Sequence, residues 1–353
     1  NKTDADIGVI LLFAAAFYGI AGLGGGFLTE RIGSRNVLLA AFLFLTICMV
    51  GQGTINVWLL FAACVALTSL GSGAIDAGFG ALFLEAFADR RSVALNHLHL
   101  FYGVGALISP ALIGVLISVG APWRLIYLIT AVMALTGAMA ISRLHVRKPS
   151  PSATAEETSE VITATERSLV PFFWLAAAMM LYEAQVSGIT IWIVRFLEDH
   201  GVGWATSALT AYWVGVSLSR LTASRILGFA SAATTCLALL VLSSIAYLIA
   251  ILSPTIAVTV VMLVIGGYLC GPIYPLILSI GGDMYPHRLS RLSGGMTMAA
   301  TFGVLLCPPL IGFLADTQGI RTGLIGAALV GIPSAVAIAM AVRVSPAVAL
   351  TGD

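Results

Sequence analysis

Eleven apolar runs divide this sequence, and each is long enough to cross a membrane. A helix of about 20 apolar residues spans the roughly 30 Å of hydrocarbon in a bilayer. The runs begin near Ile7, Val37, Val57, Ala94, Leu125, Leu169, Thr206, Ser231, Thr255, Leu292 and Thr322. Because hydrocarbon cannot hydrogen-bond an unpaired backbone N–H or C=O, such runs form helices. We therefore expect an all-α integral membrane protein with eleven spans.

Charge is scarce along the chain. Of the 353 residues, 59% are hydrophobic and 9% are charged, whereas a soluble domain is roughly 25% charged. The net charge of +1 provides no basic surface for nucleic acid, and the five cysteines lack metal-ligand spacing. The sequence contains no phosphate-binding loop and no nucleophile paired with a base. We expect a protein that is not an enzyme, with no cofactor, no metal and no nucleic-acid partner.

One polar stretch, residues 144–167, has the composition of a flexible linker and separates residues 1–143 from 168–353. The two parts share a repeat, because GALISPALIG from Gly105 and GVLLCPPLIG from Gly303 stand 198 residues apart. Two related six-helix halves in parallel repeat resemble the major facilitator superfamily. This resemblance implies that the first half here lacks its opening helix.

Basic residues favour one side of the membrane. If the linker is cytoplasmic, thirteen of 17 Lys and Arg residues, Arg220 among them, fall in loops on that side. Cytoplasmic loops carry an excess of Lys and Arg. We therefore expect a multi-pass protein of the cell (inner or plasma) membrane with a cytoplasmic linker and a cytoplasmic C-terminus.

The segment after the first run reads GFLTERIGSR and resembles the cytoplasmic loop signature of the same superfamily. An acid beside an arginine can latch to a neighbouring helix end and open with conformation. The alternative is a solvated, positively charged loop without a gating role. The residues assigned to a gating loop are Gly26, Glu30, Arg31, Gly33 and Arg35.

Two further segments, GSGAIDAGFG and LNHLHLFYGVGALISP, resemble the fucose permease-like branch, which includes fucose–proton symporters and sodium-dependent glucose carriers. The matching positions are Gly71, Gly73, Asp76, Gly78, Asn96, His99, Phe101, Gly103, Gly105 and Pro110. Gly80 stands where the branch has Asn. In the second half, LYEAQVSGITIW, AYWVGVSLSR and GPIYP resemble the seventh, eighth and tenth helices of the branch. The resemblance implies symport of a sugar with a cation.

Asp76 is the acid whose position inside an apolar run most requires an explanation. A charge at mid-membrane costs about 2.5–3.5 kcal/mol on insertion scales, and one is retained mainly where it faces the bundle interior or a wet cavity. Counting depth along the helices places Tyr102 and His99 near it, so a hydrogen-bonded cluster of the three is a hypothesis. A structural acid that pins two helices is the alternative for Asp76, and a packing role is the alternative for His99.

Glu183 is a second candidate for coupling, because no basic residue lies within a helical turn of it and a protonated carboxyl can carry a proton. A neutral, hydrogen-bonded core acid is equally compatible with the sequence. The aromatic and amide groups suited to a polar, ring-shaped substrate are also typical of helix packing. The predicted cavity residues are Tyr102, Asn96, Gln185, Trp192, Tyr212 and Tyr274.

Prolines inside two of the runs, Pro110 and Pro308, predict helix bends. Such bends would let two halves rock, although a static kink fits as well. We expect a monomeric secondary active transporter that works by alternating access in the lipid bilayer. It would carry a sugar or similar small polar solute together with H⁺, or Na⁺. Proton-coupled efflux of amphipathic compounds is the alternative.

Overall fold

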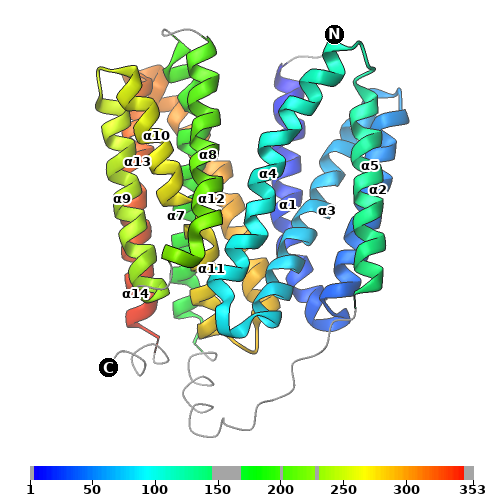
Figure 1. The fold of residues 1–353 in the computed structure, drawn as a ribbon. Coiled ribbons are helices and arrows are strands. Elements are labelled where there is room, and N and C mark those ends of the chain that lie inside the picture. Colours follow the sequence, from blue (N-terminus) through cyan, green and yellow to red (C-terminus); the bar gives the residue numbers. More distant parts are fainter. Residues whose placement is uncertain (1–3, 145–167, 199–201, 227–229, 346–353) are drawn as a thin grey trace, which may run out of the picture. The chain divides into compact units, whose positions relative to one another are not determined.

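The computed structural model describes residues 4–144, 168–198, 202–226 and 230–345, and within these ranges the regular structure is helical, without a strand. The predicted linker lies outside them except for Leu144. The helices before the linker are α1 (Asp4–Ile32), α2 (Ser34–Thr54), α3 (Trp58–Ala86), α4 (Arg91–Ser118) and α5 (Arg124–Arg143) (Figure 1).

The helices after the linker match the remaining apolar runs. They are α7 (Val170–Phe196), α8 (Val202–Ile226), α9 (Ala232–Leu252), α10 (Ile256–Cys270), α11 (Ile273–Met284), α12 (Leu289–Gln318), α13 (Ile320–Leu329) and α14 (Gly331–Arg343). The run from Thr255 is divided between α10 and α11 at Gly271 and Pro272. Proline has no backbone N–H to continue the helical ladder, which explains the break.

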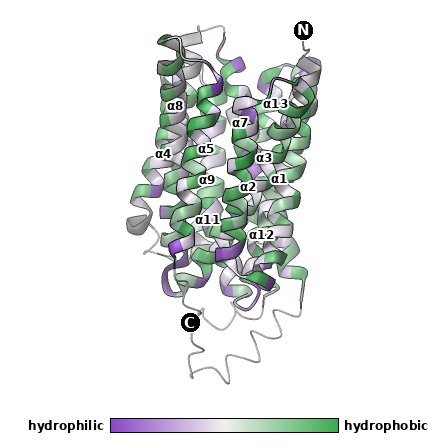
Figure 2. Cartoon of the chain, turned by 90° about the vertical axis from the view of Figure 1, so that its right-hand side faces the viewer, coloured by the Kyte–Doolittle hydropathy of each residue, from purple (hydrophilic) through white to green (hydrophobic). Residues whose placement is uncertain are grey.

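Nine helices or helix pairs in the described part of the chain are long and apolar enough to cross a membrane. Figure 2 shows hydrophobic residues along most of each helix and hydrophilic residues mainly near the helix ends. The predicted all-α membrane architecture is therefore confirmed. The count of eleven spans remains a prediction.

The described residues form two compact units. Unit 1 is drawn from residues 1–86, 108–153 and 288–301, and unit 2 from residues 87–107, 154–287 and 302–353. Both α4 and α12 are therefore shared, since each begins in one unit and ends in the other. The predicted repeat had paired the sequences of these same two helices.

Unit 1 has a core where α2, α3 and α5 meet. Leu38, Leu82 and Ile141 are buried there, and the partly buried rings of Phe42 and Phe79 pack against them. Those two rings meet edge to face, with centroids 6.1 Å apart. This arrangement is the favoured one for aromatic pairs, and it fixes α2 against α3.

The turn between α1 and α2 is shorter than the sequence suggested. The segment predicted to be a gating loop is helical from Gly26 to Ile32, and α2 starts at Ser34. Gly33 alone forms the turn, with φ of 84°. Glycine adopts positive φ without a steric penalty, so one residue suffices to reverse the chain.

Candidate functional site

Asp76 lies half-buried in α3, and a residue far along the chain contacts its carboxylate. The hydroxyl of Thr297 in α12 donates a hydrogen bond of 3.1 Å to Asp76 Oδ2. One turn earlier in α12, Ser293 donates to the carbonyl of Ala77, over 3.0 Å. We call Asp76, Thr297 and Ser293 the Asp76 cluster. All three belong to unit 1.

Glycines allow the helices around the Asp76 cluster to approach closely. A Cβ on Gly73 of α3 would overlap the carbonyl oxygen of Tyr18 in α1. A Cβ on Gly22 of α1 would lie 2.5 Å from Thr297 Cγ2. Small residues at helix contacts are typical of membrane proteins, where close packing stabilises helix association. The carboxylate of Asp76 thus lies where α1, α3 and α12 pack closely against one another.

Two of the residues assigned to gating, Gly26 and Glu30, lie beside the start of α12. Glu30 forms an ion pair of 2.6 Å with Arg291, whose guanidinium also lies 5.2 Å from the centre of the Phe27 ring. A Cβ on Gly26 would overlap the carbonyl oxygen of Ser290. The end of α1 and the start of α12 are therefore joined by charge and by close backbone packing.

The two arginines assigned to gating have separate positions. Arg35, at the start of α2, donates a hydrogen bond to the carbonyl of Ser142 at the end of α5. Arg31 is exposed in the last turn of α1. The structure therefore joins Gly26 and Glu30 to α12 and joins Arg35 to α5.

In unit 2, the first half of α4 is attached to α11 by polar contacts. Arg91 forms an ion pair of 2.6 Å with Asp283, and Ser92 donates to Ser279 over 2.7 Å. Asn96 is fully buried. Its Nδ2 donates to the carbonyl of Ser92, over 2.8 Å, and its Oδ1 has no hydrogen bond.

Arg220 corrects one part of the topology prediction. It was counted among the loop arginines, yet it lies inside α8 with 6% of its surface exposed. Its Nη1 donates to the carbonyl of His99 in α4, over 2.8 Å, and its Nε donates to the carbonyl of Gly271, over 3.2 Å. The side chain folds back onto neighbouring helices, which a count of positions along the chain cannot show.

His99, whose carbonyl accepts from Arg220, belongs to a group of aromatic contacts in unit 2. His99 and Tyr274 meet edge to face, with ring centroids 4.8 Å apart. Tyr102 lies one turn further along α4, and its ring is 6.3 Å from that of Trp213. We call Arg220, His99 and Tyr274 the Arg220 cluster.

Two of the predicted cavity residues, Gln185 and Tyr212, make buried polar contacts inside unit 2. Gln185 is fully buried, and its Nε2 donates to Ser244 Oγ and to the carbonyl of Ala328, both over 2.9 Å. Tyr212 is 1% exposed, and its hydroxyl lies 3.0 Å from Cys270 Sγ. These contacts join helices within the unit.

Trp192 and Glu183 lie along α7, where α7 packs against α12. The indole Nε1 of Trp192 donates to the carbonyl of Pro308, over 3.0 Å. A Cβ on Gly303 would lie 3.1 Å from Glu183 Cβ. Glu183 is half-buried, and like Arg220 it is close enough to Cys270 to act on it electrostatically.

The predicted site residues are thus divided between the two units. Asp76 belongs to unit 1, whereas His99, Tyr102 and Glu183 belong to unit 2. The hypothesis of an Asp76–Tyr102–His99 cluster therefore stays a prediction. Pro308 lies within α12, and Pro110 lies within α4, although its side chain is outside the described part of the structure.

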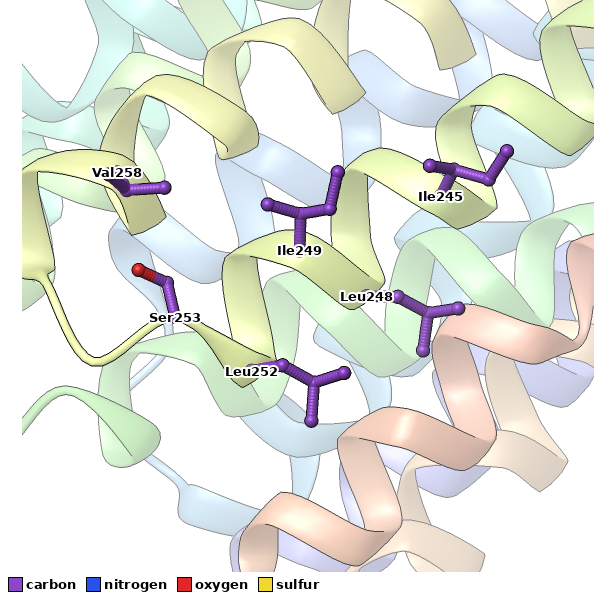
Figure 3. A pocket seen from close by; sticks show the side chains of 6 residues that line it. All are labelled: Ile245, Leu248, Ile249, Leu252, Ser253 and Val258. Atoms are coloured by element: carbon purple, nitrogen blue, oxygen red, sulfur yellow. The ribbon is translucent and has the colours of Figure 1, made fainter.

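A groove opens between α9 and α10 (Figure 3). It is lined by Ile245, Leu248, Ile249, Leu252, Ser253 and Val258. Ser253 is the one polar residue in this lining, so the groove offers no charged group to a polar solute. Within the described ranges, no group of three His, Cys, Asp or Glu residues is arranged to hold a metal ion.

The fold and these intramembrane polar clusters define a membrane transport protein of the two-unit helical type. The family model of the Major Facilitator Superfamily matches residues 1–229. The chain belongs to the major facilitator superfamily. Its fold is that of transporters rather than enzymes.

Several characterised proteins are similar to this chain. The cis,cis-muconate transport protein of Acinetobacter baylyi is 23% identical over 347 residues, which cover 92% of this chain and 82% of the relative. The structure of the E. coli fucose:proton symporter FucP is 16% identical, with a TM-score of 0.79, over 96% of this chain and 91% of that chain. The human organic anion transporter MFSD10 is 14% identical, with a TM-score of 0.75, over 96% and 86%. At these identities the two structures show the fold alone.

Two functionally interesting residues, Arg220 and Thr297, were missed by sequence reasoning. A signal existed for Arg220, because AYWVGVSLSR is an apolar run that ends in a lone cation. Thr297 carries no such signal. A threonine in an apolar helix commonly bonds a carbonyl four residues earlier, as Thr297 also does with Ser293.

Proposed function

We propose that this protein couples the uptake of a small polar solute to the movement of a cation, with H⁺ preferred over Na⁺. Transport would proceed by alternating access between a half formed by residues 1–143 and a half formed by residues 168–353. The linker and C-terminus would be cytoplasmic. The observation that carries the proposal is Asp76, a carboxylate inside span α3 that accepts a hydrogen bond from α12.

An acid at this depth is a natural carrier for a proton. Intramembrane ionisable residues are costly and commonly mark ion pathways. Protonation would remove the negative charge of Asp76, and a hydrogen bond to a neutral carboxyl is roughly half as strong as one to a carboxylate. The bond from Thr297 would weaken, and α12 would separate from α3 more easily.

The gating ion pair fits the same scheme. If the contacts between α1 and α12 open during the cycle, the Glu30–Arg291 pair must break. An ion pair that is partly exposed contributes only about 0–1 kcal/mol. Such a pair can hold one conformation without blocking the other.

The solute is either a sugar or an organic acid. The first follows from the resemblance to fucose–proton symporters. The second is favoured by a relative described as a muconate transport protein. Both solutes are small and polar, and both require hydrogen-bonding groups inside the membrane.

Proton coupling can be tested in proteoliposomes that hold the purified protein. L-fucose and cis,cis-muconate would be offered with an imposed proton or sodium gradient, and external pH would be recorded with the uptake. Symport predicts that adding the substrate makes the medium more alkaline. A medium that becomes more acidic would instead indicate antiport. An uptake rate that is the same with and without either gradient would exclude coupling.

A further inference from the structure

Arg220 is a buried cation that the coupling scheme does not use. It lies inside α8, with 6% of its surface exposed, and its side chain contacts α4 and the end of α10. Arginine remains protonated in proteins. Burying a permanent positive charge is costly unless the charge is paired and hydrogen-bonded, so Arg220 is a candidate for a functional role.

Within the described part of the chain, no acid forms an ion pair with this charge. The two hydrogen bonds of Arg220 go to backbone carbonyls, those of His99 and Gly271. Across the described ranges it forms no ion pair. Carbonyl dipoles satisfy individual N–H groups, but they do not cancel a full positive charge.

The guanidinium still has donors to offer. It carries five N–H groups, and one on Nε and one on Nη1 are used. Neither of the hydrogen bonds described for Arg220 uses Nη2. Neighbouring N–H groups of a guanidinium have the spacing that a carboxylate requires for two parallel hydrogen bonds.

The surroundings of Arg220 suit an organic anion. His99, whose carbonyl accepts a hydrogen bond from Arg220, meets the Tyr274 ring edge to face, with centroids 4.8 Å apart. The phenol of Tyr182 donates to the carbonyl of Cys270, over 3.1 Å, and lies within electrostatic range of Arg220. Rings held in this way offer flat apolar surface beside a fixed charge, which is suited to the carbon skeleton of an organic acid.

We propose that Arg220 is the anchor for the carboxylate of an ionised organic acid, and that organic acids are the substrate class of this transporter. This inference rests on the proposed function, because it names the solute of the same transport cycle.

Binding without a gradient separates this proposal from symport itself. The purified full chain would be titrated with adipate, benzoate and gluconate, each compared with its neutral amide, and with L-fucose. We expect at least one acid to bind, and its amide to bind roughly 10- to 100-fold more weakly, since hydrogen bonds to charged groups contribute this difference.

Variants test the role of Arg220 directly. Arg220→Gln should lower the affinity for the acid by the same roughly 10- to 100-fold and leave the affinity for the amide unchanged. Arg220→Lys keeps the charge and should retain part of the preference for the acid. Arg195→Gln is the matched control, because Arg195 is an exposed arginine of the same unit.

Four outcomes would overturn the proposal. These are equal binding of acid and amide, wild-type affinity in Arg220→Gln, binding of L-fucose but of no acid, and no binding of any probe. The folding of Arg220→Gln is checked by size-exclusion chromatography. If it does not fold, the proposal is tested by the acid and amide affinities of the wild type and by the acid affinity of Arg220→Lys. Acid binding without proton coupling would support this anchor and refute symport, whereas coupled uptake of L-fucose alone would do the reverse.

Discussion

The hydroxyl of Thr297 donates a hydrogen bond of 3.1 Å to Oδ2 of Asp76, and so joins α12 to α3 within unit 1. The two residues are 221 positions apart in sequence. A hydrogen-bond donor in one helix therefore contacts a titratable group in another helix directly. This relationship is the basis for the first two predictions.

Replacing Asp76 with Asn should abolish cation-driven uptake and leave substrate exchange intact. Asparagine keeps the size and an acceptor oxygen but cannot lose or gain a proton near neutral pH. Uptake under a gradient and counterflow would be measured in the same proteoliposomes. Gradient-driven uptake at the wild-type rate would refute a coupling role.

Replacing Thr297 with Val should weaken the α3–α12 junction. The change removes a donor to a carboxylate, and such bonds contribute about 1.5–3 kcal/mol. Thr301→Val is the matched control, because Thr301 Oγ1 donates only to the carbonyl of Thr297 in its own helix. We expect a lower melting temperature and altered uptake for the first variant, and a smaller effect for the second. Equal effects would mean that the bond to Asp76 has no special role.

Replacing Gly73 with Ala should separate α1 from α3. The new Cβ would overlap the Tyr18 carbonyl oxygen, and overpacking of this kind costs about 1–3 kcal/mol. Gly24→Ala is the control, because a Cβ there would meet nothing within 4 Å. Thermal unfolding should show a loss for Gly73→Ala and no loss for Gly24→Ala.

Removing one charge of the Glu30–Arg291 pair should change transport more than stability. Exposed pairs contribute about 0–1 kcal/mol, so Glu30→Gln and Arg291→Gln should melt close to the wild type. Their maximal uptake rates should differ from the wild type if the pair opens during the cycle. The swapped variant, Glu30→Arg with Arg291→Glu, should recover the rate, and a failure to recover would argue against the pair as a latch.

Replacing Gln185 with Leu distinguishes a packing role from a substrate role. Gln185 is fully buried and donates to Ser244 and Ala328. Losing these contacts should destabilise the protein by about 1–3 kcal/mol without changing KM. A raised KM with an unchanged melting temperature would instead support the predicted place in the substrate cavity.

Most of the fold could be predicted because apolar length is a local property. Each described helix coincides with a run in the sequence, and the runs from Thr255 and Thr322 differ only in being divided in two. The gating segment was less predictable. Its signature suggested a loop, but Gly33 completes the turn by itself, so Gly26 and Glu30 remain helical.

The sequence by itself determined the membrane-spanning helices, the superfamily and the presence of an acid within a span, because these follow from composition and from motifs within one helix. The tertiary structure decided the partners. It brings the Thr297 hydroxyl into hydrogen-bonding contact with Asp76, and it buries Arg220 inside unit 2 rather than in a loop. The physical reason is that contacts between helices depend on how their faces pack, and the spacing within one helix does not specify the face of another.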